Sequence, residues 1–393
     1  MATTDRLGGD RTSRILIAPV TVSPTKPLTP THLKYLLSLD MLFRATATFA
    51  DVTLLYHHAA YAASHQVTGF WEYLDHVHPG LAYDALTEEE IGELYIAFHQ
   101  DRQSRLPAGL ARPNPAEAEA GWMHPVSARL LDLWERHYRL LGICDPGLGR
   151  TGPPLAAEAE ILDLLASRGL CIDGRPFSAP VYLDATAAGL PLRAILTPGW
   201  QANYLLSTLR QLIPLLGGYD LVVLAHDAGL RSDYRTIEYV LRAFGVAVTR
   251  FEVSRVPIGG TTCSTRFGGW QGYTMAAFAS QLTEEFGLEA FRLGLRLYLI
   301  AGLGGVTCQS FSTQHLKRWA RRARKLLAEQ HGRGQDASVA WYLHRLAGRR
   351  GYADPNRIAA ALMARDDTAP ITGLLRVLMN DRPSERRYLR CAN

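Results

Sequence analysis

The residues best suited to chemistry form a short loop late in the chain. Residues 262–268 read Thr-Cys-Ser-Thr-Arg-Phe-Gly, so two hydroxyl side chains stand beside a guanidinium. The fork of Arg266 can bridge two oxygens of a phosphate, which makes this loop a candidate anion contact. Glycine pairs at 259–260 and 268–269 bracket the loop, a pattern that fits a mobile lid and equally fits simple turns.

Further candidates end predicted strands or begin a predicted helix. His32 lies at a helix N-terminus, where backbone N–H groups attract phosphate or carboxylate, although its side chain can instead cap the helix. His57 and His58 end a strand, and at most one of them faces a ligand because neighbouring strand residues point oppositely. We take His57 as the candidate that orients substrate or acts as general base. Asp227 ends another strand and fits a ribose contact or a solvated loop acid.

Length and composition describe an ordinary globular chain. The 393 residues are 47% hydrophobic and 20% charged, and two domains are expected at this length. No apolar run is long enough to cross a bilayer, and the first residues lack the apolar core of a signal peptide. We therefore expect a cytoplasmic protein with no membrane partner. The five cysteines are scattered, so neither a disulfide framework nor a metal site is expected.

Positive charge gathers toward the C-terminus, although the formal net charge is only +5. Residues 317–325 read Lys-Arg-Trp-Ala-Arg-Arg-Ala-Arg-Lys. This clustering favours a polyanion such as tRNA, whereas a solvated helix face is the plainer alternative. The candidate tRNA contacts are Lys317, Arg318, Arg321, Arg322, Arg324 and Lys325.

Apolar periodicity predicts an α/β chain that begins with one βαβ unit. Residues 14–22 and 52–56 are predicted to be buried strands, and residues 31–46 a helix with Thr31 as its N-cap. Two strands joined by a helix imply a parallel sheet. Thr87 followed by Glu90 is a capping-box pattern that starts another helix.

The remaining pattern divides the chain into regions. Strands are predicted at 181–183, 193–196, 220–225 and 247–253, with helices at 157–167, 204–216 and 234–244, and mostly helix from 275 onward. We expect residues 1–58 and 151–275 to form the two halves of a Rossmann-like α/β catalytic domain. Residues 59–150 would then be a helical insertion, and residues 276–393 a basic helical region that binds tRNA.

Three segments, in this order, resemble class I aminoacyl-tRNA synthetases, and the arginyl enzymes in particular. Residues 29–32, Thr-Pro-Thr-His, occupy the place of the first family signature, His-Ile-Gly-His, and Asp40 with Arg44 resembles the Asp-x-Leu-x-Arg that follows it. Residues 218–227 resemble the family's Gly-Phe-Asp, strand, Gly-Ala-Asp run. Residues 262–268 resemble the second signature, Lys-Met-Ser-Thr-Arg-Lys-Gly, of which Ser264, Thr265, Arg266 and Gly268 are kept.

The resemblance implies a HUP-type Rossmann-like sheet with an adenosine site. It implies His32 and Arg266 as catalytic groups, and as contacts to substrate or adenosine Thr29, Thr31, Asp40, Asp227, Ser264, Thr265 and Gly268. Asp40 and Arg44 are one helical turn apart, however, and can equally pair with each other.

The chain also departs from the family where the family holds ATP. Thr262 and Phe267 replace the two lysines that steady the phosphates, and Thr29 replaces a histidine. Pro198 and Gly199 replace an arginine and an aspartate that orient the amino acid and ATP in the arginyl enzymes. Because one lost donor typically costs about 100- to 1,000-fold in rate, these losses should cripple activation by ATP.

A reaction that transfers an already activated acyl group needs no ATP, so it does not depend on the lost cations. Aminoacyl-tRNA is an activated ester, and cyclodipeptide synthases transfer its acyl group on a class I-like fold with a serine after the first strand. Ser23 is in that place and is our candidate acyl carrier, although a serine before Pro24 also fits a turn. We therefore expect a tRNA-dependent aminoacyl transferase of specialised metabolism, which forms an amide or ester such as a cyclodipeptide or an aminoacylated metabolite.

Two other functions stay open. An ATP-dependent ligase, either a divergent synthetase or an amino acid ligase, would need Arg266 to compensate for the lost lysines. A catalytically silent paralogue would bind tRNA and perform neither reaction. For the transferase we expect aminoacyl-tRNA and a small-molecule acceptor as partners and no cofactor, whereas the ligase alone would use ATP.

Overall fold

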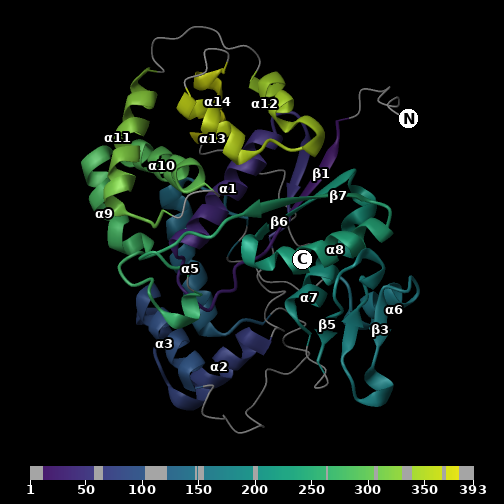
Figure 1. The fold of residues 1–393 in the computed structure, drawn as a ribbon. Coiled ribbons are helices and arrows are strands. Elements are labelled where there is room, and N and C mark those ends of the chain that lie inside the picture. The colour runs from purple at the N-terminus through teal and green to yellow at the C-terminus, as the bar shows by residue number, and fades with distance from the viewer. Residues whose placement is uncertain are drawn as a thin grey trace.

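A four-stranded parallel sheet forms the centre of the protein. In the computed structural model, β1 (Arg14–Pro19) lies between β2 (Asp51–Leu54) and β6 (Leu221–Asp227), and β7 (Ala247–Val253) completes the order β2-β1-β6-β7 (Figure 1). The predicted parallel α/β class is therefore confirmed. The structure describes residues 12–56, 65–101, 122–146, 148, 155–197, 202–262, 264–304, 309–329, 339–364 and 369–379.

Helices cover both faces of this sheet because its strands alternate between two apolar clusters. Ile15 and Ile17 of β1 point toward α1 (Pro30–Thr46) on one face. Leu16 and Leu224 point to the other face, where the helices α7 (Tyr204–Leu212) and α8 (Arg231–Ala243) supply the apolar contacts. A strand buried on both faces has no polar side, which is why the sequence shows continuous apolar runs here.

Helix α1 begins earlier than the sequence indicated. Its N-cap is Thr29, not Thr31, and Pro30 occupies the first helical position. Proline fits this place because the first turn of a helix does not need its N–H. The shift matters for the site because it puts Thr31 and His32 inside the first turn.

A second, smaller sheet was not foreseen. The strands at 181–183 and 193–196 exist, as β4 (Val181–Leu183) and β5 (Arg193–Leu196), but they form an antiparallel sheet with β3 (Cys171–Asp173) outside the parallel one. Strand β3 was missed because it is three residues long and two of them are exposed. This sheet lies beside α6 (Glu158–Ala166), at the lower right of Figure 1.

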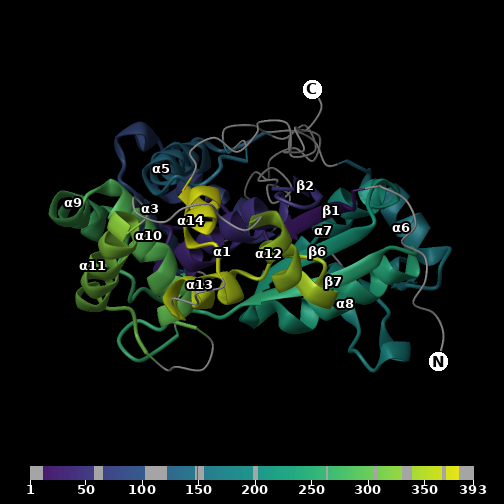
Figure 2. The same cartoon turned by 90° about the horizontal axis from the view of Figure 1, so that it is seen from above.

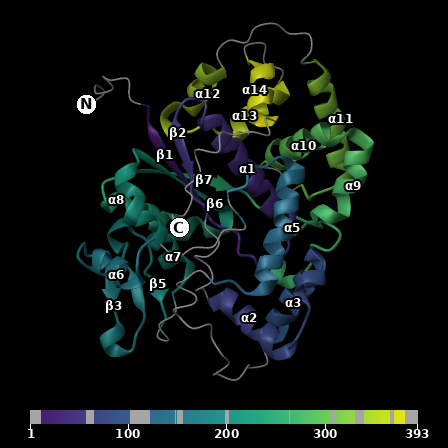
Figure 3. The ribbon, with the colours of Figure 1, turned by 180° about the vertical axis from the view of Figure 1, so that it is seen from behind.

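Three α-helices lie between β2 and α6 in the described part of the chain. They are α2 (His65–Val77), α3 (Glu88–Asp101) and α5 (Pro125–Leu141). The predicted capping box at the start of α3 is present, since the Thr87 N–H donates to Glu90 Oε2 at 2.8 Å and the Glu90 N–H donates to Thr87 Oγ1 at 3.2 Å. Figure 3 shows α5 running alongside α1, with α2 and α3 at its lower end.

The C-terminal region is helical, as predicted. Helix α10 (Leu288–Leu297) continues into a π-helical turn (Tyr298–Gly302) and packs against α11 (Thr313–Glu329), where a Cβ on Gly294 would lie 2.6 Å from Ala320 Cα. The other helices of the region are α9 (Met275–Phe286), α12 (Val339–Ala347), α13 (Pro355–Ala364) and α14 (Ile371–Met379). Seen from above in Figure 2, α12, α13 and α14 lie over the α1 side of the molecule. Within the described ranges, no helix is both long and apolar enough to span a membrane.

Candidate active site at the carboxyl end of the sheet

The first turns of α1 are fastened to the ends of the central strands by three side chains. Thr31 Oγ1 accepts the N–H of Val256 at 3.0 Å, and Lys34 Nζ donates to Ser254 Oγ at 2.6 Å. Tyr35 donates its hydroxyl to the carbonyl of Ala225 at 2.8 Å. Ligands bind at this edge in open α/β sheets, so these bonds fix the helix start where a site is expected.

His32 serves as part of the helix cap in this structure. Its Nδ1 accepts the N–H of Thr29 at 3.1 Å, and Thr29 Oγ1 lies at the same distance. Because a backbone N–H can only donate, the neutral ring carries its proton on Nε2. Burial, together with the cations Lys26 and Arg255, lowers the pKa of His32 to about 3, although a hydrogen bond to the Pro27 carbonyl opposes this shift.

A neutral His32 can donate a hydrogen bond but cannot supply a positive charge at physiological pH. The observed contacts of His32 are those of a helix cap, which was the alternative that the sequence left open. A catalytic role for His32 remains a prediction. Thr29, also named as a substrate contact, is buried within the same cap.

Asp227 is held by the loop that follows the neighbouring strand. Its Oδ1 accepts the N–H of Gly229 at 2.6 Å and lies 3.0 Å from both Nε and Nη2 of Arg255. A Cβ on Gly229 would lie 2.7 Å from the Arg255 guanidinium carbon, so glycine leaves room for this ion pair. The pair ties the carboxyl ends of β6 and β7 together, and the predicted ribose contact would have to share the carboxylate with Arg255.

Lys34 was missed by the sequence analysis. Its side chain is buried, with the residue 3% exposed, and its ammonium also donates to the carbonyl of Leu303 at 2.7 Å. Burial lowers the pKa of Lys34 to about 8. The signal was present in the sequence, because a single cation stands within the apolar run Leu33-Lys34-Tyr35-Leu36-Leu37.

Ser23 lies between β1 and α1, directly before the turn at Pro24 and Thr25. Its carbonyl accepts the N–H of Thr25 at 2.8 Å, and the residue is half-buried. The carbonyl of the next residue, Pro24, accepts Ser127 Oγ of α5 at 2.7 Å, which holds the turn against the helical insertion. The turn alternative is thus observed, and the acyl-carrying role of Ser23 stays a prediction. His57 and His58 lie outside the described residues.

The signature loop packs on α3. Its central residues form a short 3₁₀ turn, Thr265–Phe267, and the indole of Trp270 donates to the Thr265 carbonyl at 3.1 Å. Gln271 donates to Glu93 of α3 at 2.9 Å. The ring of Trp270 fills a notch at Gly92, where a Cβ would overlap the ring and lie 2.9 Å from Pro27 Cδ. The loop and the β1–α1 segment therefore meet at one residue of α3.

The side chains of the loop divide into two groups. Ser264 and Thr265 are half-buried and Gly268 is buried, whereas Arg266 and Phe267 are exposed. Gly268 and Gly269 have φ of 76° and 77°, and Gly259 and Gly260 have φ of 57° and 83°. Both glycine pairs thus adopt turn conformations that glycine favours. Whether the loop moves as a lid stays a prediction.

Asp40 lies away from this edge, in the interior. Its two oxygens pair with Arg44 at 2.8 Å and Arg296 at 3.0 Å, and Oδ1 also accepts the N–H of Cys144 at 3.1 Å. Burial alone would raise the pKa of Asp40, but the two guanidinium groups hold it below its ordinary value. The pairing with Arg44 that the sequence left open is observed, and no oxygen of Asp40 is left without a partner.

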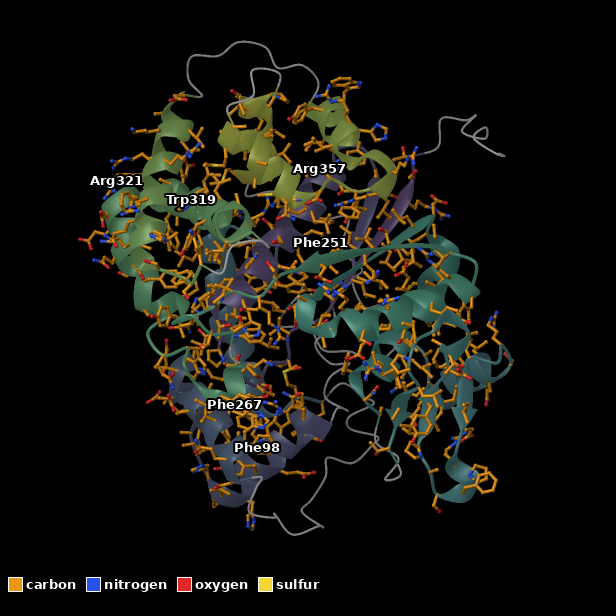
Figure 4. All side chains as sticks on the ribbon, viewed as in Figure 1. Phe98, Phe251, Phe267, Trp319, Arg321 and Arg357 are labelled. Carbon is orange, nitrogen blue, oxygen red and sulfur yellow. The ribbon has the colours of Figure 1, made fainter. Side chains whose placement is uncertain are left out.

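The basic helix α11 presents its cations on an exposed face (Figure 4, Arg321). Lys317 pairs with Glu285 at 2.7 Å, Arg321 lies 4.0 Å from the same carboxylate, and Arg322 donates to the Met363 carbonyl at 2.7 Å. Arg318, Arg324 and Lys325 are exposed and make no ion pair with described residues. These three are the α11 cations most available to a phosphate backbone.

A metal centre finds no support in the part of the chain that the structure describes, where no three His, Cys, Asp or Glu side chains gather in a way that could hold an ion.

Comparison with known proteins shows the fold. No protein-family model matches the sequence, and no curated protein matches it either. Among solved structures, the chain is similar to the arginyl-tRNA synthetase of Thermus thermophilus, with 13% identity, a TM-score of 0.61, and coverage of 95% of this chain and 76% of that one. It is also similar to the arginyl-tRNA synthetase of Plasmodium falciparum, with 11% identity, a TM-score of 0.51, and coverage of 96% and 77%. The chain has a class I aminoacyl-tRNA synthetase-like fold.

Proposed function

We propose that this protein transfers an aminoacyl group from charged tRNA to a small acceptor and does so without ATP. The observation that carries the proposal is that few cations at the carboxyl end of the sheet are available to bind a triphosphate. Amino acid activation would place the charges of a triphosphate there, and fixed cations must meet them.

The signature loop supplies little of that charge. Thr262 and Phe267, which stand where the family has lysines, are neutral and exposed. The Arg266 guanidinium stacks on the ring of Phe267, 4.6 Å from its centroid. The loop thus retains one cation, Arg266, where the family's signature has three.

The ionisable side chains near α1 are also neutral, ion-paired or buried. His32 is neutral, Arg255 pairs with Asp227, and Lys34 is buried between two neutral acceptors. Lys26 is half-buried with its ammonium 5.9 Å from the centroid of Tyr95. One cation of this kind can balance the single charge of a phosphodiester but not the several charges of a triphosphate, which supports an RNA end as the ligand.

A polyanion is further supported by α11. The helix offers Arg318, Arg324 and Lys325 to solvent, and an exposed row of cations is the usual electrostatic footprint of nucleic-acid binding. The nucleophile is the open part of the proposal. Ser23 would hold the acyl group in a covalent version, and the acceptor would attack the ester directly in the other; nothing in the fold favours a cyclodipeptide over other products.

A product assay tests the proposal. The protein is incubated with a set of charged tRNAs and candidate amine or alcohol acceptors, without ATP, and new amides, esters or cyclic dipeptides are identified by mass. Loss of the acyl group from one charged tRNA with formation of such a product is expected. Ser23→Ala tests the covalent version, and full activity of that variant would leave direct transfer.

Two outcomes would replace the proposal. Amino-acid-dependent exchange of pyrophosphate into ATP would identify a ligase. Binding of tRNA without acyl transfer or exchange would identify a silent tRNA-binding protein.

A further inference from the structure

Phe267 is among the most exposed aromatic side chains of the described residues. Its exposed fraction is 70%, and it stands at the tip of the signature loop (Figure 4). Arg266 lies against the ring at 4.6 Å and is exposed as well. The loop therefore offers solvent a planar aromatic group and a planar cation side by side.

This pair is held in place by the turn beneath it. The N–H of Phe267 donates to the Ser264 carbonyl at 3.0 Å, and the N–H of Gly268 donates to the Thr265 carbonyl at 3.2 Å. Trp270, 1% exposed, donates to the Thr265 carbonyl and packs its ring against α3 at Gly92, so it anchors the turn to that helix. An exposed ring on an anchored turn loses little conformational freedom when a ligand binds to it.

The pair also belongs to the surroundings of the proposed site. A Cβ built on Gly268 would lie 3.4 Å from Ile96 of α3, so the loop approaches this helix closely. The ammonium of Lys26 lies over the ring of Tyr95, the residue before Ile96. The notch at Gly92 joins Trp270 of the loop to Pro27 of the β1–α1 segment. The turn that carries the exposed pair and the half-buried cation Lys26 thus both lie against α3.

We infer that Arg266 and Phe267 form a stacking platform for the 3′-terminal nucleotide of the RNA substrate. A nucleotide has a π-face for the ring and a phosphate for the guanidinium, whereas an apolar ligand would gain nothing from Arg266. The inference rests on the proposed use of charged tRNA. It gives Phe267 a role in binding a base where a lysine would bind phosphate.

A double-mutant cycle on the ligand and the protein tests the platform. Dissociation constants are measured for the wild type and Phe267→Ala, each with uncharged total tRNA that is intact or lacks its terminal adenosine. The wild type should bind the shortened tRNA at least about fivefold more weakly, in keeping with base–aromatic stacking. Phe267→Ala should bind both forms with the same weakened affinity, because the ring that reads the adenosine is absent.

Conservative variants separate stacking from simple apolar contact. Phe267→Trp should keep the dependence on the adenosine, and Phe267→Leu should lose it. Phe177→Ala is the matched control, since Phe177 is 86% exposed in the 3₁₀ turn between β3 and β4. A wild type indifferent to the terminal adenosine, or a Phe267→Ala variant that still discriminates, overturns the platform.

The same variants keep this inference apart from the proposed function. Coupling in the cycle without any acyl transfer would leave the platform standing and remove the transferase. Acyl transfer by the wild type, undiminished in Phe267→Ala and without coupling in the cycle, would remove the platform alone.

Discussion

Lys34 and Ser254 are joined by a hydrogen bond of 2.6 Å, which links the first turns of α1 to the residue after β7. The acceptors of this buried ammonium, Ser254 Oγ and the Leu303 carbonyl, are both neutral. A charge in this environment is costly, so the protonation state of Lys34 should affect stability.

We expect stability to rise with pH through the titration of Lys34. Burial lowers its pKa from 10.5 to about 8, so between these values the unfolded chain binds more protons than the native one. The free energy of unfolding of the wild type relative to Lys34→Met should therefore increase by up to about 3 kcal/mol from pH 8 to pH 10.5. Urea denaturation at several pH values measures this difference, and a constant difference would contradict the assignment.

The ring of His32 should remain neutral in mildly acidic solution. Its pKa is lowered to about 3, below the ordinary value of 6.5, so the native state resists protonation and loses stability as the pH falls from 6.5 toward 3. Nitrogen-15 NMR of the imidazole should show the Nε2–H tautomer down to about pH 4. His32→Ala identifies the signal, and half-protonation of that signal near pH 6 would refute the prediction.

Asp40→Asn should destabilise the protein by about 3–5 kcal/mol, because it leaves the buried Arg44 and Arg296 without their counter-charge. The stabilising effect of Asp40 should be fully present above its ordinary pKa of 3.8 and be lost as the pH falls through its lowered value. Chemical denaturation measures both effects. Asp173→Asn breaks a half-exposed pair with Arg175 and should change stability by less than about 1 kcal/mol.

Gly92→Ala should detach the signature loop from α3. The new Cβ would overlap the Trp270 ring and press on Pro27, at a cost of about 1–3 kcal/mol. Faster amide hydrogen exchange in residues 264–274 would report the release. Gly69→Ala is the matched helical control, since its Cβ would meet Phe98 at an ordinary 3.5 Å and should stabilise α2 by about 0.5–1 kcal/mol. Equal exchange in both variants would show that the notch does not hold the loop.

Removing Arg318, Arg324 and Lys325 together should weaken tRNA binding and flatten its salt dependence. Every one of these cations that binds a phosphate in the wild type should, when removed, reduce the slope of log K against log salt by about 0.7–0.9. Affinity measured at several salt concentrations gives the slope. Arg175→Ala with Arg231→Ala removes two exposed, acid-paired cations elsewhere and should leave the slope unchanged. An unchanged slope in the triple variant would show that RNA binds another surface.

The sequence was a good guide wherever the structure depends on local pattern. The βαβ start, the capping box of Thr87 and Glu90 and the helical C-terminus all follow from periodicity and side-chain caps, which act over a few residues. The pairing of β3 with β4 escaped prediction because a three-residue, half-exposed strand has no periodic signal.

The site shows a different limit. The sequence indicated which residues carry chemistry, but not which of them are already used by neighbours. Asp40 meets Arg296, which is 256 positions away, and Asp227 meets Arg255 from the loop after the next strand. Such partners depend on tertiary structure, and so does the burial that makes Lys34 unusual.

The order of the central sheet has a consequence for how the chain is made. Strand β1 pairs in register with β6, Ile15 opposite Leu221, so its inner neighbour is about two hundred residues away. On the ribosome, β1, α1 and β2 must wait for most of the polypeptide before their apolar faces are covered. Pairing between strands that are far apart in the sequence slows folding and leaves intermediates with exposed apolar surface. Nascent chains that stop before β6 should therefore aggregate or recruit chaperones.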